Sequence, residues 1–240
     1  MGMKSRVAAL PATRASAPVV GFDSIYQRAA KRKGGPAALE ALLPRAKSRA
    51  ALIKTGDDRY LSAMAQAIFR AGFVWKVVDN KWPGFEAAFK RFAIHKVASM
   101  DEQDLDELAR DPQIIRNRTK ISAVRDNAQF VFDVVAEHGS FGRYLADWPQ
   151  EDLIGLWADL HRRGSRLGGF TRAYFLRTVG KDAFLLTGDV VKALIGAGVV
   201  HKSPTAKRDL IATQSAFYAW HQETGRPYCE LSRIMACSVD

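Results

Sequence analysis

The chain has 240 residues, of which 48% are hydrophobic and 25% charged, and its formal net charge is +11. This length allows one large domain or two small ones with an ample core, and the lack of a long apolar run excludes a membrane span. The two cysteines, Cys229 and Cys237, are too few for a disulfide framework. We therefore expect a protein of the reducing cytoplasm, without a signal peptide.

The positive charge is concentrated near the N-terminus. Residues 1–54 carry eleven Lys or Arg against Asp23 and Glu40, whereas the other 186 residues carry 25 basic and 23 acidic side chains. A basic arm beside a nearly neutral body favours a polyanionic partner such as nucleic acid. A solubilising tail is the alternative.

Residues 1–20 are rich in Ala, Pro, Ser and Arg and show no apolar periodicity, which predicts a flexible basic arm. Residues 21–240 are expected to form a helical domain, either as one unit or as two helical lobes with a cleft between them. We see no internal repeat.

In the first half of the chain, short helical patterns alternate with glycine and proline stops. Asp23 or Ser24 can cap the first helix, and Asp57 or Asp58 a later one. The other expected elements are helices at 36–43 and 117–136, a segment from Pro83 that buries three phenylalanines, and a helix capped by Asp101.

The second half is also predicted to be helical, at 151–163, 171–179, 189–197, 205–224 and 227–236. No pair of alternating runs is joined by an Asn-Gly or Asp-Gly turn, so nothing indicates a sheet. The predicted fold class is all-α.

The stretch from Leu160 to Asp189 is the most informative. A helix ends in a basic run, a glycine turn follows at Leu167, Gly168 and Gly169, and a second helix leads to Asp189. Glycine amides and the start of a helix together form a site for phosphate. Six Lys or Arg and no acid lie between residues 161 and 181. We expect DNA contacts from these residues: Arg166, Leu167, Gly168, Gly169, Phe170, Thr171 and Arg172.

This pattern resembles the helix-hairpin-helix DNA glycosylase superfamily, in which a glycine hairpin is followed some two dozen residues later by a catalytic Asp. Gly168 stands in place of the usual proline and Thr171 in place of the second glycine. Asp189, 22 residues after Leu167, matches the catalytic position. An Asp before a helix is also a good N-cap, and the two roles are compatible.

Residues 60–135 contain the ordered blocks AGFVW, GFEAAF, an acidic helix that follows Met100, and IIRNRTK, which leads into a long helix. In their order and spacing these blocks resemble the DNA-3-methyladenine glycosylase I family. The resemblance implies a helix-hairpin-helix fold that binds double-stranded DNA with a damaged base. It also implies hydrolysis of the N-glycosidic bond of alkylated purines, such as 3-methyladenine, after base flipping. We also expect a monomer.

The family's site can be carried over only in part. Trp75 matches the family's stacking Trp and Tyr26 one of its tyrosines, but Ala67 stands where the family has a substrate-reading Glu. The remaining candidates for the base pocket lie on the helix before Trp75: Tyr60, Gln66 and Phe69.

No cofactor and no metal are expected. Ala30 replaces a zinc-binding His of the family, and the five histidines lack the spacing of metal ligands. Ala173 occupies the position of the Schiff-base Lys of bifunctional relatives, which predicts a monofunctional enzyme.

Two other functions remain open. One is a DNA-lesion-binding protein on the same fold that no longer cleaves, which the loss of the family Glu favours. The other is a helical scaffold whose basic arm binds acidic partners. Arg116, Arg118 and Lys120 can contact phosphates or form ion pairs with the acidic helix at 101–111.

Overall fold

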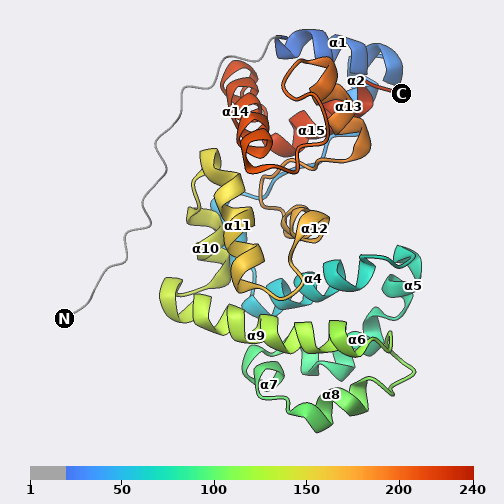
Figure 1. Ribbon diagram of the computed structural model, residues 1–240, viewed down its shortest axis with the longest axis vertical. Coiled ribbons are helices and arrows are strands. Elements are labelled where there is room, and N and C mark those ends of the chain that lie inside the picture. The colour runs from blue at the N-terminus through green and yellow to red at the C-terminus, as the bar shows by residue number, and fades with distance from the viewer. Residues whose placement is uncertain (1–19) are drawn as a thin grey trace, which may run out of the picture.

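The computed structural model describes residues 20–240, and all regular secondary structure within that range is helical (Figure 1). This confirms the predicted all-α class. The predicted basic arm lies outside the described residues, apart from Val20. No helix of the described range is long and apolar enough to cross a membrane.

The helices of the first half are α1 (Phe22–Lys33), α2 (Pro36–Glu40), α3 (Arg49–Lys54), α4 (Asp57–Arg70), α5 (Trp75–Asn80), α6 (Trp82–Ala88), the 3-10 helix η1 (Lys90–Phe92), α7 (Ile94–Ala98), α8 (Glu102–Leu108) and α9 (Arg118–His138). Those of the second half are α10 (Phe141–Asp147), the 3-10 helix η2 (Gln150–Asp152), α11 (Leu153–Arg163), α12 (Gly169–Val179), α13 (Gly188–Gly196), α14 (Lys207–Thr224) and α15 (Tyr228–Cys237).

Helix caps explain why the long helices could be predicted. The side chain of Asn117 accepts a hydrogen bond from the Lys120 amide at the start of α9, and Gly139 ends that helix with a φ of 83°. Asp101 and Asp104 form a reciprocal capping box at the start of α8. The short helices α3, α5, α7 and α10 were not among the predicted ones, because five to seven residues are too few to show a period.

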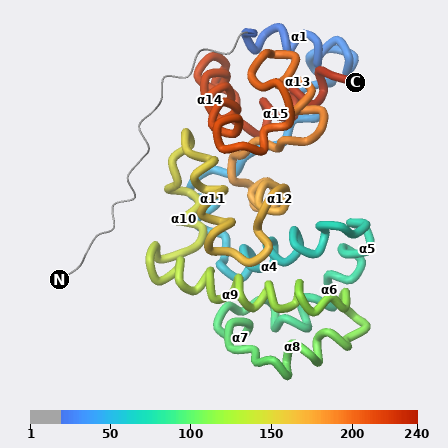
Figure 2. The backbone as a smooth tube through the Cα atoms, viewed as in Figure 1, coloured from blue at the N-terminus to red at the C-terminus, as the bar shows by residue number. Residues whose placement is uncertain are grey.

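The helices form an elongated arrangement (Figure 1). Helices α4–α9 lie at one end and α1, α2 and α13–α15 at the other, with α10–α12 between them. The two ends of the described chain meet in the second group, as the tube in Figure 2 shows. There the Trp220 indole donates to the Val20 carbonyl, 3.2 Å away, and Arg32 pairs with Asp240.

Two hydrophobic clusters share their central helices. The larger includes α1 and α10–α15, and the smaller includes α5–α8, while α4 and α9 contribute to both. Met64 and Ile68 of α4 lie in the larger cluster, whereas Leu61 and Phe69 lie in the smaller one. Helices α4 and α9 therefore fix the position of everything that packs on them.

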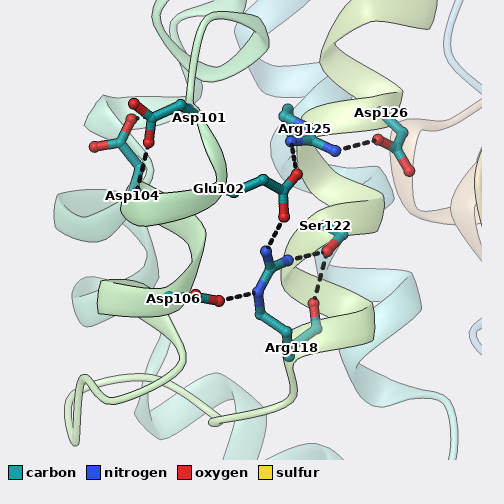
Figure 3. Close-up of polar contacts among 8 residues, drawn as sticks. All are labelled: Asp101, Glu102, Asp104, Asp106, Arg118, Ser122, Arg125 and Asp126. Atoms are coloured by element: carbon teal, nitrogen blue, oxygen red, sulfur yellow. Dashed lines mark hydrogen bonds and ion pairs between the residues drawn. The ribbon is translucent and has the colours of Figure 1, made fainter.

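Helix α8 is held on α9 by ion pairs (Figure 3). The Arg118 guanidinium bonds to Glu102 and Asp106, and Arg125 bonds to Glu102 at 2.7 Å. Hydrogen bonds from Arg125 and Arg118 lower the pKa of the Glu102 carboxyl. The sequence left two roles open for Arg118, phosphate contact and ion pairing, and the structure shows ion pairing.

A non-helical segment between α12 and α13 carries the chain toward α15. The Asp182 carboxylate in this segment accepts hydrogen bonds from the backbone amides of Tyr228 and Cys229, at 3.0 and 2.9 Å, and from Gln150 at 2.6 Å. These contacts satisfy the free amides at the start of α15. They also fix the direction in which the chain leaves α12.

Replacement of Asp182 with Ala is expected to lower the free energy of unfolding by about 1–3 kcal/mol, because two buried amides lose their acceptor. Urea denaturation measures the change. The control is Asp189→Ala, which removes an exposed carboxylate of α13 and should cost about 0.5 kcal/mol or less. Equal losses for the two variants would contradict the capping role.

Candidate functional site

The chain reverses between α11 and α12 in a tight turn over residues 164–168. Arg166 adopts a φ of 58°, and Leu167 is fully buried. A Cβ on Gly164 would lie 2.8 Å from the Leu160 carbonyl oxygen, so only glycine fits there. The reversal begins at Gly164, three residues earlier than predicted, and Gly169 already belongs to α12.

Helix α9 holds this turn through a buried asparagine. The Asn127 Nδ2 donates to the Ser165 carbonyl, and the Ser165 amide donates to Asn127 Oδ1, both at 2.9 Å. Asn127 has no exposed surface. Both polar groups of the side chain are thus used on one residue of the turn, which fixes the turn against α9.

The turn forms one wall of a cavity of about 460 Å³. The other walls are the end of α4, the start of α9, the end of α11 and the first turn of α12. The lining residues are Ile68, Ala71, Lys120, His161, Gly164, Arg166, Gly168 and Thr171.

Lys120 is the buried cation of this cavity. Its Nζ donates to the carbonyl oxygens of Phe69 and Ala71, at 3.3 and 2.5 Å, and lies 4.6 Å from the centre of the Phe73 ring. Burial, together with the nearby Arg166 charge, lowers the pKa of the Lys120 ammonium. Because an ammonium has three protons and two are used, one remains for a ligand.

The cavity is positive. Lys120 and Arg166 form no ion pair within residues 20–240, and no Asp or Glu lies among the lining residues. His161 adds an imidazole, whose ring lies beside Gly168. The cavity therefore attracts negative charge and repels a cation.

Several exposed apolar side chains lie on α12 and on the segment that follows α4. Trp75 and Phe170 both contact Tyr174, with ring centroids 5.2 and 6.5 Å apart. Val74 is 70% exposed and Phe170 56%. Large apolar groups in water mark a binding surface.

The predicted DNA-binding residues separate into two groups. Arg166, Gly168 and Thr171 line the cavity, Gly169 begins α12 and Phe170 is exposed. Leu167 is instead a core residue, and the Arg172 guanidinium lies 5.3 Å from the centre of the Trp157 ring. Burial lowers the pKa of Arg172. Leu167 and Arg172 thus contribute to packing.

None of the residues predicted for the base pocket lines this cavity. Trp75 is 45% exposed and contacts Arg70 and Tyr174 rather than lining the cavity. Gln66 donates to the Asp79 carboxylate at 3.3 Å, beside the bonds that Arg70 makes to the same oxygen.

Three further pocket candidates have packing roles. The Tyr26 hydroxyl donates to Glu40, which Arg226 also binds, and the hydrogen bond to Glu40 raises the pKa of Tyr26. The Tyr60 hydroxyl donates to the Leu52 carbonyl at 2.7 Å, and burial raises the pKa of Tyr60 to about 12. Phe69 packs edge-on against Phe85.

Asp189 lies away from the cavity. It is exposed in the first turn of α13, which packs against α15 near the C-terminus, whereas Trp75 begins α5 in the opposite half of the molecule (Figure 1). Thr187 rather than Asp189 caps α13. Asp189 and Trp75 therefore lie in different parts of the molecule, because the Asp182 contacts direct the chain after α12 toward α15.

Among the polar side chains of the cavity, Lys120 was expected only to contact phosphate or to form an ion pair, and His161 received no site assignment from the sequence. Lys120 ends the Ile-Ile-Arg-x-Arg-x-Lys block, so the motif contained the signal but not the direction of the side chain. His161 is a single histidine without a spaced partner, and no pattern singles it out. Among residues 20–240, no group of three His, Cys, Asp or Glu could hold a metal ion.

The helices and the cavity define an all-α protein with a positively charged cavity at a helix–turn–helix junction. The sequence profile of the methyladenine glycosylase family matches residues 52–177, more than half of the chain. The chain belongs to this family. The matched range contains the whole cavity but neither Tyr26 nor Asp189.

Individual relatives match over shorter stretches. DNA-3-methyladenine glycosylase 1 of Escherichia coli (strain K12) is 42% identical over 60 residues, which are 25% of this chain and 32% of that enzyme. The structure of a mutant of 3-methyladenine DNA glycosylase I from Staphylococcus aureus has 26% sequence identity and a TM-score of 0.48. The match covers 52% of this chain and 77% of that one. The structure of a 3-methyladenine DNA glycosylase I mutant in complex with 3-methyladenine has 25% sequence identity and a TM-score of 0.47. The match covers 66% of this chain and 94% of that one.

Asn127→Ala is expected to destabilise the protein by about 2–3 kcal/mol, since both bonds to Ser165 are lost in a buried place. Urea denaturation measures the loss, and fluorescence anisotropy should show weaker binding to duplex DNA. The control is Gln129→Ala on the exposed face of the same helix, which should lower the free energy of unfolding by about 0.5 kcal/mol or less. An Asn127→Ala protein with wild-type stability would show that the turn does not need this anchor.

Proposed function

We propose that this protein is a DNA glycosylase of base excision repair, which hydrolyses the N-glycosidic bond of alkylated purines in duplex DNA. The observation that carries the proposal is the family match over residues 52–177, because these residues build the whole cavity. The base that the relatives' names give, 3-methyladenine, is the reference substrate.

The surface suits a bent DNA strand with one everted nucleotide. The backbone of the glycine turn faces the cavity and can bind phosphate, while Phe170 and Val74 are exposed and can contact bases. The everted nucleotide would enter between Ile68 of α4 and Thr171 of α12.

The reaction is proposed to be monofunctional. Ala173, at the position of the Schiff-base Lys, is buried in the core. Lys120 is the amine of the cavity, and two carbonyl oxygens hold its protons. These bonds hold the Lys120 Nζ at the cavity wall, so we assign the attack on the sugar to water rather than to this amine.

A protein that binds lesions without cleaving is the second candidate. Ala67 lies on α4 one turn before Ala71, and no carboxylate of the described residues lines the cavity to replace the family Glu. Binding needs only the cations and the apolar surface, so it would survive this loss.

We further propose that residues 21–240 act as one domain, since the two cores share α4 and α9, and that the protein is a cytoplasmic monomer. Cys229 and Cys237 are both buried and unpaired, which suits a reducing compartment.

The direct test incubates the full chain with duplexes that carry 3-methyladenine or ethenoadenine and measures the released base by chromatography. Release above the spontaneous rate is expected for at least one of them, without an adduct trapped by borohydride. No release, together with lesion binding that weakens as salt rises, would favour the non-cleaving candidate. No lesion preference at all would contradict both.

Asp189→Asn is expected to leave the rate of base release unchanged within about twofold, because Asp189 is exposed on α13, away from the cavity. Single-turnover kinetics with saturating protein measures this rate. A loss of a hundredfold or more would return Asp189 to the mechanism.

A further inference from the structure

The positive charge of the cavity affects which bases it can bind, because a charged base interacts with it electrostatically. Lys120 and Arg166 are cations without a carboxylate partner in the described residues, and the lining includes no acid. Alkylation at a ring nitrogen, as in 3-methyladenine, leaves the attached purine with a positive charge. Such a base would be placed against like charges in a partly desolvated cavity, which is unfavourable.

The leaving group differs between the two kinds of base. When the bond from the sugar to a cationic base breaks, the base departs neutral, and the charge to be stabilised is positive and lies on the sugar. A nearby carboxylate serves that purpose. When the base is uncharged, it departs with the bonding electron pair and becomes negative. Cations and N–H donors then stabilise the transition state.

We propose that the cavity takes an uncharged alkylated purine, and that Lys120 and Arg166 stabilise the negative charge that this base acquires as it leaves. The inference rests on the proposed function and narrows its substrate class. It follows from which cations are present in the cavity and from the absence of acids among the lining residues.

The two cations differ in how firmly they are held. Lys120 is 5% exposed, and the carbonyls of Phe69 and Ala71 fix its Nζ while leaving one proton free. Arg166 is exposed on the turn, which Asn127 anchors through the adjacent Ser165. Lys120 is thus a fixed and desolvated donor. Such a donor can stabilise the departing base without reorganising during the reaction.

The step balances without another reactant. The bond between the sugar C1′ and the base nitrogen breaks, and its electron pair goes to the base. Water forms a bond to C1′ and releases one proton to solvent. The departing base takes up one proton from solvent. The products are an abasic sugar and a neutral free base.

The cleavage experiment compares two lesions of opposite character in the same duplex sequence. Ethenoadenine is an uncharged alkylated purine, and 3-methyladenine is a positively charged one. For each, the single-turnover rate of base release is divided by the spontaneous rate. We expect the acceleration to be larger for ethenoadenine by about tenfold or more.

Matched variants separate the cavity charge from the overall charge. Arg166→Gln removes the exposed cation of the cavity and should slow ethenoadenine release by about tenfold or more while leaving 3-methyladenine release unchanged or faster. Arg162→Gln removes the same charge from a side chain that pairs with Asp159 and does not line the cavity, so neither rate should change. Thermal denaturation of both variants confirms that they are folded.

A binding experiment keeps the inference testable if the protein does not cleave. Duplexes with 2′-fluoro-7-methylguanine, which is charged and resists hydrolysis, are compared with duplexes with 7-methyl-7-deazaguanine, which has the same shape without the charge. We expect tighter binding to the uncharged base and a smaller difference for Arg166→Gln.

The outcomes are distinct. The inference is overturned if the acceleration is larger for 3-methyladenine and Arg166→Gln slows the release of that base. The proposed glycosylase would then still stand. No release of either base, with tighter binding to the uncharged lesion, overturns cleavage but supports charge selection. No release and no difference between the two lesions overturns both.

Discussion

Two side chains of α9, Asn127 and Lys120, hold the structure of the site together. Asn127 uses both of its polar groups on Ser165 of the turn. Lys120 donates to the carbonyl of Phe69, in the last turn of α4, and to that of Ala71, which follows the helix. Both side chains are buried, where a missing partner would cost more than the bond contributes. Three segments far apart in sequence are therefore joined around one cavity through a single helix.

The same arrangement decides the chemistry. Lys120 occupies the cavity as a cation, Arg166 adds a second one from the turn, and Ala67 leaves the wall of α4 without the acid that the family has. A positive cavity inside a methyladenine glycosylase fold favours phosphate and a departing anion over a cationic base. The proposed lesion is therefore uncharged, unlike the 3-methyladenine that the names of the relatives give.

Much of the fold could be predicted, because caps such as Asn117 and Asp101 and long apolar periods are local properties of the sequence. The glycine turn was also recognisable. Asp189 was misplaced because the direction of the chain after α12 depends on Asp182, whose partners lie some 46 residues away. Gln66 likewise lies on the expected helix, but a bond to Asp79, invisible in a linear pattern, turns it away from the cavity.

The most direct measurement is a crystal structure of the full chain bound to a duplex with a tetrahydrofuran abasic site. The account predicts that the abasic sugar enters the cavity between Ile68 and Thr171, with the glycine turn on its phosphates and Arg166 facing the space that the base would occupy. A sugar bound at α13 beside Asp189, or a duplex that leaves the cavity unfilled and contacts only other surfaces, would contradict it.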